Sequence, residues 1–554
     1  IMNRNSELWF SDVPEITVPR SKFEMPTTHK DTWNDGEIIP MGIWEVLPGD
    51  TVNMKMSTVV RMVTPLYPTM DNCYMDVAFF YCPARLLWTH WKEFWGENTN
   101  AWYQNIEYEV PHVYTDDENE VYFEEGSVAD HMGIPVGKAR VSVSQLPFRG
   151  YVKIWNDWYR SEVVDQEAPT TMADNDLKLT SASKPAYKGG TVLKANKFFD
   201  YFTSALKSPQ KGPSVMLPLG ERAPVRTYGS NVPEGTETKY DLYWKATSGT
   251  NFTPATTYGI VARSHSTENQ PYAYTNLQYT ENQGIASQIY PSNLWADLTT
   301  ATSATLGTIR QAIALQHFYE RQAYGSRYIE FIKNIFGVTS PDARLQRSEF
   351  LGSKRIPINI YQATQQSATT ESSPIGHTGA FSHTADADEY FTKSFTEHGY
   401  LYCMVVCRTE KSYSQGVDRM FTRRKFTDYY IPTFNSVGDQ EIKNSEIYIS
   451  GTDTDDEIFG YSERYAEYRY GNPNKLTGAF RPDATNSLDA WHYGEDYDTT
   501  PALSATWLKE DRSVIDRTLA VTDGSIDQFF GDFFFNPTWV RPMPIHSVPG
   551  LSRI

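Results

Sequence analysis

The sequence predicts a mainly β protein, a β-sandwich whose connections are enlarged by helices and loops. Three observations support this fold class. Residues 51–88 contain two successive apolar runs with the pattern of strands, residues 400–407 form a third run, and a further strand is expected at 529–540. Strands towards both ends of a long chain, with helices and loops between them, are typical of a sandwich with long insertions.

The stretch from Thr51 to Trp88 organises this prediction, because it describes two neighbouring strands separated by a proline-containing turn. The first run alternates apolar and polar side chains with the period of two that a half-buried strand requires. The second run loses this alternation, so we expect its second half to be covered on both faces. The apolar positions are Val52, Met54, Met56, Val60 and Met62 in the first run and Cys73, Met75, Val77, Phe79 and Tyr81 in the second.

Other segments carry weaker periodic signals. Residues 400–407 alternate two sets of apolar side chains, as expected of a strand that is buried on both faces. Further short strands are expected at 447–450, 514–521 and 529–540. Apolar residues that recur three or four positions apart predict amphipathic helices. These helices are expected at 87–95, 151–159, 198–206, 309–319 and 328–336, with a short one beginning at Ser340.

The chain divides into an arm, a core in two parts and an insertion. Residues 1–46 contain few periodic segments and are interpreted as an extended N-terminal arm. Residues 47–226 and 306–554 are the two parts of the sandwich core, the second ending in an extended tail. Residues 227–305 contain fifteen Thr and eight Tyr but only three Lys or Arg. Such a composition buries little apolar surface, so we interpret this segment as a surface insertion or protrusion.

Composition limits the kind of partner that this chain can bind. The formal net charge of −18 argues against a protein whose whole surface contacts nucleic acid or anionic membrane, so any contact with a polyanion must be local. No run of eighteen apolar residues or secretory signal is present, which predicts a soluble protein made in the cytosol, without membrane insertion. Thirty-six Tyr and fourteen Trp favour wide, partly polar contacts such as those of extensive self-association.

Motifs for catalysis and metal binding are not found. The sequence contains no Gly-x-Ser-x-Gly elbow, phosphate-binding loop or His-Glu-x-x-His pair. The four cysteines lie in apolar runs without zinc spacing, and we interpret them as buried thiols. The acidic residues Asp453, Asp455, Asp456 and Glu457 lack the spacing of a calcium loop and are interpreted as a solvated turn. We therefore expect no enzymatic activity and no cofactor.

The densest basic patch is the candidate for contact with DNA. Arg419, Arg423, Arg424 and Lys425 are interleaved with Phe421, Phe426, Tyr429 and Tyr430. Cations that bind phosphate, combined with rings that stack on bases, suit single-stranded nucleic acid. The alternative is that these cations form intrachain ion pairs with the abundant carboxylates or lie in a contact between subunits.

Several short motifs span both ends of the chain and most of it outside 227–305. They include LPGDT at 47–51, FFYCP at 79–83, LPFR at 146–149, FGVTSPDARLQR at 336–347, EHGY at 397–400, AEYRY at 466–470 and RPMP at 541–544. These motifs closely resemble those of the major capsid protein of microviruses, in particular of the gokushovirus group.

This resemblance implies a fold, an assembly and a set of partners. The fold is an eight-stranded antiparallel jelly roll, and sixty copies form a T=1 icosahedral shell around a circular single-stranded DNA genome. The implied partners are an internal scaffolding protein, a DNA pilot protein and a small basic DNA-associated protein. The implied location is the virion, assembled in the cytoplasm of a host bacterium.

In the gokushovirus group a long insertion builds protrusions at the threefold axes, and residues 227–305 are the matching segment. We expect it to bind a host cell-surface receptor. The candidate contact residues are Tyr258, Tyr272, Tyr274 and Tyr279.

Two alternatives remain at this stage. A jelly-roll protein that binds or cleaves carbohydrate would suit the abundant aromatic and acidic residues, and it would need two carboxylates facing each other across a cleft. A free single-strand binding protein would need a continuous basic groove, which conflicts with the net charge.

Overall fold

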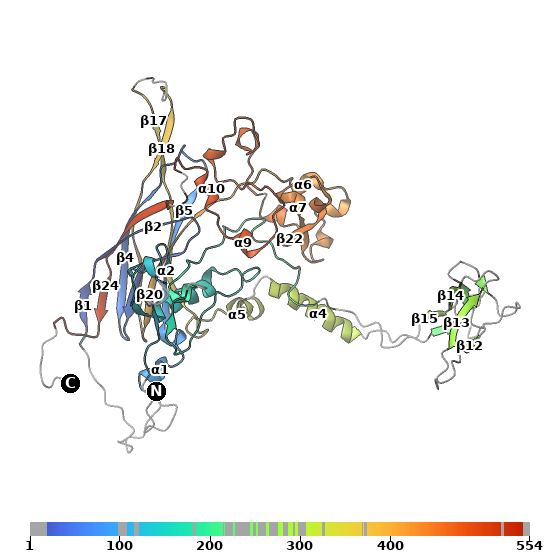
Figure 1. Ribbon diagram of the computed structural model, residues 1–554, viewed down its shortest axis with the longest axis horizontal. Helices are drawn as coiled ribbons and strands as arrows, with labels where there is room; N and C mark the ends of the chain where they lie inside the picture. Colours follow the sequence, from blue (N-terminus) through green and yellow to red (C-terminus); the bar gives the residue numbers. More distant parts are fainter. Residues whose placement is uncertain are drawn as a thin grey trace, which may run out of the picture. The chain divides into compact units, whose positions relative to one another are not determined.

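The computed structural model describes residues 19–97, 108–115, 121–180, 184–213, 215, 306–323, 327–367, 369, 374–471, 473–521, 524 and 526–546, and short strands between 225 and 296. The chain divides into two compact units, a larger one of residues 1–209 and 322–554 and a smaller one of residues 210–321. The larger unit is mainly β, and its long strands form two antiparallel sheets (Figure 1).

The first sheet consists of six strands, β1 (Ser21–Glu24), β2 (Thr27–Trp33), β4 (Thr51–Met62), β19 (Thr384–Ser394), β23 (Phe529–Phe535) and β24 (Thr538–Arg541). β19 pairs with one edge of β4, while β23 and then β24 pair with its other edge. β2 continues the sheet beyond β23, and β1 beyond β24. Burial alternates along β4 with the predicted period of two, so the prediction for 51–62 is confirmed.

The second sheet consists of four strands, β3 (Ile39–Val46), β5 (Cys73–Pro83), β16 (Glu349–Pro357) and β20 (Gly399–Thr409). β20 lies between β3 and β5, and β16 pairs with the other edge of β5. The side chains from Val77 onward in β5, and all those of β20 except Arg408, are buried. The predicted strands at 73–83 and 400–407 are therefore confirmed, including burial on both faces.

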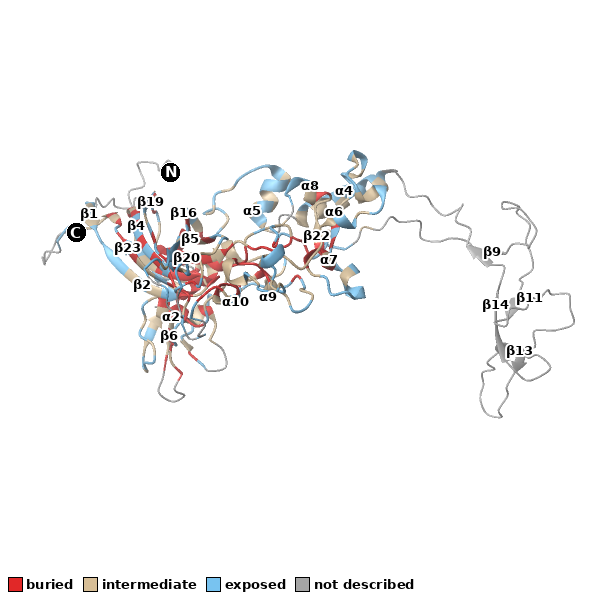
Figure 2. Ribbon diagram, turned by 90° about the horizontal axis from the view of Figure 1, so that it is seen from above, coloured by how far each residue is buried: buried red, intermediate tan, exposed pale blue. Residues whose placement is uncertain are grey.

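The main hydrophobic core is built from the inward faces of both sheets, and it appears as the buried interior of the larger unit in Figure 2. Val52 and Met54 of the first sheet share this core with Phe79 and Leu401 of the second. β4 and β5 do not pair with each other, because residues 63–72 carry the chain from one sheet to the other. The prediction that these two strands are neighbours was wrong: they belong to opposite layers.

The outer face of the second sheet is covered by a second core. Phe80 and Tyr402 of this face pack with Tyr151, which lies on the helix that was predicted at 151–159. This helix, α3 (Leu146–Ile154), continues as the π-helix η3 (Trp155–Tyr159). The other elements of this layer are η2 (Ala84–Leu86), α1 (Trp91–Phe94), β6 (His112–Tyr114), α2 (Val128–His131), β7 (Ser142–Ser144), β8 (Leu177–Lys178) and η4 (Ala186–Lys188).

The segment between β20 and β23 forms short helices around a third small core. The predicted strands at 447–450 and 514–521 were wrong, because short apolar runs do not distinguish strand from helix. Its elements are α6 (Arg419–Thr422), η7 (Phe426–Asp428), η8 (Pro432–Phe434), β21 (Gln440–Lys443), α7 (Asn444–Ile447), η9 (Asp453–Asp456), β22 (Ile458–Ser462), α8 (Ala466–Arg469), η10 (Gly478–Phe480), η11 (Asp489–Trp491), α9 (Ala505–Leu508) and α10 (Ser513–Asp516).

The remaining helix predictions have mixed outcomes. The helix predicted at 328–336 is formed by α5 (Tyr328–Phe331) and η6 (Ile332–Phe336), and it ends at Gly337 with a φ of +69°. Residues 198–206 form turns, and so does the segment after Ser340, so those two predictions were wrong. At 198–206 the Asp200 carboxylate accepts hydrogen bonds from the backbone amides of Phe202 and Thr203, which closes a turn in place of a helix.

The interpretation of residues 1–46 as an extended arm was wrong for its described part. Residues 21–46 form β1, β2 and β3, which are strands of the two core sheets. Burial along β2 falls mainly on Trp33, and the other side chains of this edge strand are half-buried or exposed. Such a strand has little apolar signal in its sequence.

The smaller unit is wider than the predicted insertion at 227–305, since it spans 210–321. A five-stranded sheet has the order β11-β10-β14-β13-β12, and β9 pairs with β15. The helix predicted at 309–319 is confirmed as α4. The elements are β9 (Val225–Thr227), β10 (Trp244–Ala246), β11 (Asn251–Phe252), β12 (Ala262–Ser264), β13 (Thr275–Thr280), β14 (Ala286–Pro291), β15 (Leu294–Ala296) and α4 (Leu306–Ala323).

Candidate nucleic-acid interface

The predicted basic patch lies between β20 and β23, on α6 and the turn that follows it. α6 is a single turn, and the backbone becomes extended at Arg423. The Asp428 carboxylate then accepts hydrogen bonds from the backbone amides of Arg424 and Lys425, at 2.9 and 2.8 Å. These two bonds lower the pKa of Asp428. The resulting turn holds four cationic residues on one short segment.

Two of the four cations are tied into the protein itself. Arg419 Nη1 lies 3.3 Å from Glu446 Oε1, and Arg423 Nη2 lies 2.9 Å from Glu467 Oε1. Burial acts to lower the pKa of Arg419, but Glu446 opposes it and the net pKa is raised. Arg419 therefore stays charged, and the guanidinium groups of Arg419 and Arg423 are both paired with carboxylates of the same chain. For this pair, the alternative of intrachain ion pairs is the correct one.

Arg423 is also packed against aromatic rings. Its guanidinium carbon lies 4.5 Å from the ring centroid of Tyr468 and 5.5 Å from that of Tyr429. Only 9% of its side chain is exposed. A guanidinium held by one carboxylate and two rings has little freedom to reach an external phosphate, so Arg423 serves to hold the turn in place.

The other two cations face solvent. Arg424 and Lys425 are exposed, and within the described part of the chain neither side chain lies at ion-pair distance from a carboxylate. Phe421 is 70% exposed and Phe426 73% exposed, which is unusual for such large apolar rings. Tyr429 and Tyr430 are exposed as well. The accessible part of the patch thus combines two cations with four rings, a combination that binds the backbone and bases of a single strand.

Of the four predicted attachment residues, only Tyr279 lies in the described part of the chain. Tyr258, Tyr272 and Tyr274 lie outside the described residues, and Tyr279 is placed on β13, of which only the backbone is described.

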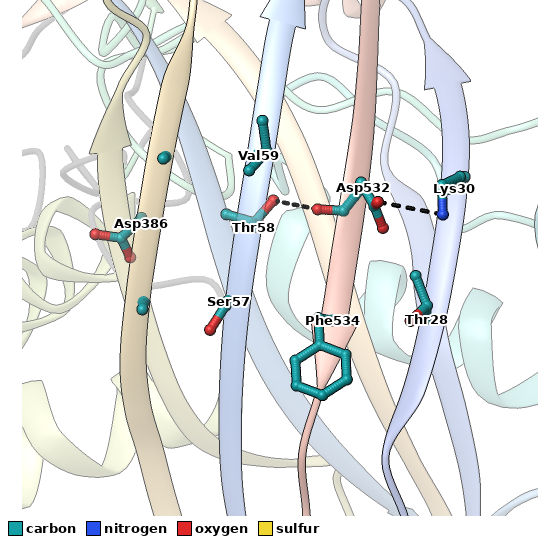
Figure 3. A pocket seen from close by; sticks show the side chains of 10 residues that line it. Thr28, Lys30, Ser57, Thr58, Val59, Asp386, Asp532 and Phe534 are labelled. Atoms are coloured by element: carbon teal, nitrogen blue, oxygen red, sulfur yellow. Dashed lines mark hydrogen bonds and ion pairs between the residues drawn. The ribbon is translucent and has the colours of Figure 1, made fainter.

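A shallow groove of about 580 Å³ crosses the outer face of the first sheet, with walls from β2, β4, β19 and β23 (Figure 3). Its two acids are already paired: Asp532 lies 3.2 Å from Lys30, and Asp386 lies 2.9 Å from Lys354. Figure 3 shows the Asp386 side chain pointing away from Asp532. The groove does not present two free carboxylates to each other, as a glycoside-cleaving site requires.

The larger unit contains a buried charge network that the sequence did not reveal. Lys411 Nζ is 2.7 Å from Glu510 and 3.6 Å from Glu495, and Lys197 Nζ is 2.8 Å from Glu495. Asp35 is fully buried, and neither of its carboxylate oxygens has a hydrogen-bond partner. Burial, and then the charge of Glu510, raises the pKa of Asp35. The partners in these ion pairs are 84, 99 and 298 positions apart in the sequence, so no short motif could have found them.

The four cysteines are buried free thiols, as predicted. Burial raises the pKa of all four, that of Cys82 to about 12, which keeps them protonated. Among the described residues no three metal-ligating side chains converge. Within the same residues, no helix combines the length and apolarity needed to cross a bilayer.

Comparison with known proteins shows similarity to viral capsid proteins along almost the whole chain. Residues 11–551 match the family model described as "Capsid protein (F protein)". The capsid protein VP1 of Bdellovibrio phage phiMH2K is 36% identical over 99% of this chain and 98% of its own length. The VP1 capsid proteins of Chlamydia phage 1 and Spiroplasma virus 4 are 34% and 36% identical, over 98% and 97% of this chain and 98% and 96% of their own lengths.

Proposed function

The chain belongs to the F-protein family of capsid proteins, and we propose that sixty copies of it build a T=1 icosahedral shell around a circular single-stranded DNA genome. The chain is thus a major capsid protein of the microvirus type and not an enzyme. The observation that carries this proposal is the family match, which includes the sandwich, its helical layer and the insertion. The carbohydrate alternative has no comparable support. Shells purified by sedimentation should contain nuclease-protected circular single-stranded DNA. Empty shells from infected cells, or double-stranded contents, would refute the genome part of the proposal.

The strand order supports an eight-stranded jelly roll. β23 and β24 lie end to end along β4, and they act as one long strand. β2 and β1 likewise lie end to end along β23 and β24, and they act as a second long strand. The first sheet then has the order β19, β4, β23/β24, β2/β1, and the second has the order β16, β5, β20, β3. Consecutive strands alternate between the two four-stranded antiparallel sheets, except that β5 and β16 follow each other within the second sheet. This order matches the double Greek key of a jelly roll.

Within this shell, Arg424 and Lys425 are proposed to contact the genome, while Arg419 and Arg423 hold the turn that presents them. The support is the division of the patch into two exposed cations with four exposed rings and two arginines bound to Glu446 and Glu467. The chain carries a net charge of −18, so such local contacts suit a genome whose bulk charge is neutralised by a separate basic protein.

Charge reversal of the exposed pair, Arg424→Glu with Lys425→Glu, should lower the DNA content of shells that still assemble, because two phosphate contacts per subunit become repulsive. The matched control reverses two exposed cations elsewhere, Arg61 and Lys207, and should leave the content unchanged. The ratio of absorbance at 260 and 280 nm in sedimented shells measures the effect. Equal DNA content in both variants, or side chains that face the exterior of the particle, would remove Arg424 and Lys425 from the interface.

Residues 227–305 are proposed to form the surface that binds a host cell-surface receptor, with Tyr258, Tyr272, Tyr274 and Tyr279 as candidate contacts. The support is their tyrosine- and threonine-rich sequence and their place within a separate compact unit. We also propose an internal scaffolding protein, a DNA pilot protein and a small basic DNA-associated protein as partners. Assembly is proposed to take place in the cytoplasm of a host bacterium.

A further inference from the structure

A two-stranded ribbon leaves the larger unit between β16 and β19. It consists of β17 (Ile360–Thr364) and β18 (Thr378–Ser382), which pair antiparallel in an unbroken register. Within the described residues, β17 pairs with no strand other than β18. Figure 1 shows the ribbon projecting beyond the ends of the neighbouring strands of the sandwich. The free edge of β17 therefore leaves unpaired backbone groups next to solvent.

The base of the ribbon is fixed to the core. Ile358 is buried, and its backbone amide donates a hydrogen bond to the carbonyl oxygen of Cys73 at 2.8 Å. The backbone amide of Asn359 donates to Oγ1 of the buried Thr384, also at 2.8 Å. Ala380 and Ser382 of β18 are buried as well. The sandwich thus sets the direction in which the ribbon projects.

The projecting part carries an exposed pair of aromatic rings. Tyr361 and Phe381 lie directly opposite each other, with ring centroids 5.4 Å apart and an interplanar angle of 25°. They are 46% and 51% exposed, and Ile375 beyond them is 61% exposed. A two-stranded ribbon is only marginally stable by itself, and apolar rings at its surface gain stability when a partner covers them.

The charge of the ribbon limits the partner. The ten residues of β17 and β18 contain no charged side chain. The groove face of the first sheet differs, because it carries ion pairs such as Lys30 with Asp532 and Lys55 with Glu389. A ribbon without cations has nothing to attract phosphate, and a ribbon without anions has nothing to attract a basic protein. It is complementary to another neutral, partly apolar protein surface.

We propose that the face of the ribbon that carries Tyr361 and Phe381 docks on a second copy of this chain. In a shell the surface available beside each copy is that of its neighbours, so the inference rests on the proposed assembly. Paired rings at the centre of a small contact act as anchors, and the free edge of β17 can add main-chain hydrogen bonds.

Site-specific crosslinking tests which molecule covers the ribbon. Ala363 is exposed and lies two residues from Tyr361 on the same face of β17. All four native cysteines are buried, so a benzophenone maleimide should label only the thiol of Ala363→Cys in folded subunits. Irradiation of assembled shells should give a product of twice the chain mass, and the same labelled subunits, when dissociated, should not. A crosslink to DNA or to a different protein, or labelled shells without the dimer product, would overturn the proposal.

A second experiment measures the contribution of the rings. The double variant Tyr361→Ser and Phe381→Ser should lower the yield of shells about tenfold or more, since both anchors are lost. The matched control, Gln362→Ser on the opposite face of β17, should assemble as the wild type does. Thermal unfolding of the isolated subunits should be the same for all three chains.

Normal assembly of the double variant, or a lower Tm of its isolated subunit, would contradict a contact between copies. A wild type that forms no shell at all would refute the proposed function as well, whereas wild-type shells without ribbon crosslinks would refute the ribbon contact alone.

Discussion

The buried network around Lys411 contains more carboxylates than cations. Glu495 and Glu510 form ion pairs with Lys197 and Lys411, whereas the buried carboxylate of Asp35 has no hydrogen-bond partner. Burial and the charge of Glu510 raise the pKa of Asp35, while Lys411, Lys194 and Arg408 act in the opposite direction without reversing the shift. Burial and the nearby charge of Glu510 thus favour protonation of Asp35 in the folded chain.

This protonation predicts a pH dependence that Asp35→Asn should abolish. The folded pKa of Asp35 lies above the unfolded value of 3.8, so folding takes up a proton and wild-type stability falls as pH rises above that value. The variant should become more stable than the wild type by about 1.4 kcal/mol for each pH unit above it, until the folded pKa is reached. Urea unfolding of unassembled chains at pH 4, 6 and 8 measures the difference.

Asp31 provides a matched control of opposite sign. His131 Nδ1 lies 2.7 Å from the Asp31 carboxylate. Burial opposes the ionised carboxylate, but hydrogen bonds from His131 and His29 prevail and lower the pKa of Asp31 to about 2. Its contribution to stability is present above pH 3.8 and is lost as pH falls towards 2, so Asp31→Asn should destabilise the chain at neutral pH. A difference between Asp35→Asn and the wild type that did not change with pH would contradict a protonated Asp35.

At the scale of elements, the strands that the sequence predicts are those in the interior of each sheet. β4, β5, β20 and β23 each have a neighbour on both edges, and their apolar patterns are strong. β3 was missed although its side chains are apolar for the most part and are mainly buried or half-buried. The other edge strands, β2, β16 and β19, were missed because solvent covers much of them and polar side chains are tolerated. β19, with the sequence TADADEYFTKS, is an example.

The candidate site could be predicted only in part, for a related reason. The clustering of Arg419 to Lys425 is visible in the sequence, whereas the division of the patch into bound and exposed cations is not. Glu446 lies 27 residues from Arg419, and Glu467 lies 44 residues from Arg423. Only the fold brings these carboxylates to the arginines, so the sequence left the alternatives of DNA contact and internal ion pair open.

The smaller unit gives a prediction at the same scale. Replacing residues 210–323, which include the smaller unit and the end of α4, by a flexible linker should leave the sandwich folded, because the chain divides into two compact units and the three hydrophobic cores described above lie in the larger one. Shells of this variant should assemble but lose adsorption to host cells. Adsorption is measured by depletion of particles from the medium, with the unmodified shell as the control. Normal infection by the deleted particle would refute attachment through the insertion.

At the scale of the whole molecule, acidic composition, a two-sheet core and exposed contact surfaces agree with the capsid family to which the chain belongs. The net charge of −18 restricts the proposed DNA contact to local patches, while the uncharged ribbon and exposed rings are suited to the proposed contacts between copies. A capsid subunit needs no catalytic pocket, because its function is to build a shell with other subunits.

Electron cryomicroscopy of particles purified from cells that express the chain with its partners tests this account most directly. We predict closed shells of sixty subunits with icosahedral symmetry, two sheets in each subunit with the strand orders given above, and the Arg424 side chain on the inner wall. Particles with another number of subunits, or a chain that remains monomeric under assembly conditions, would contradict the account.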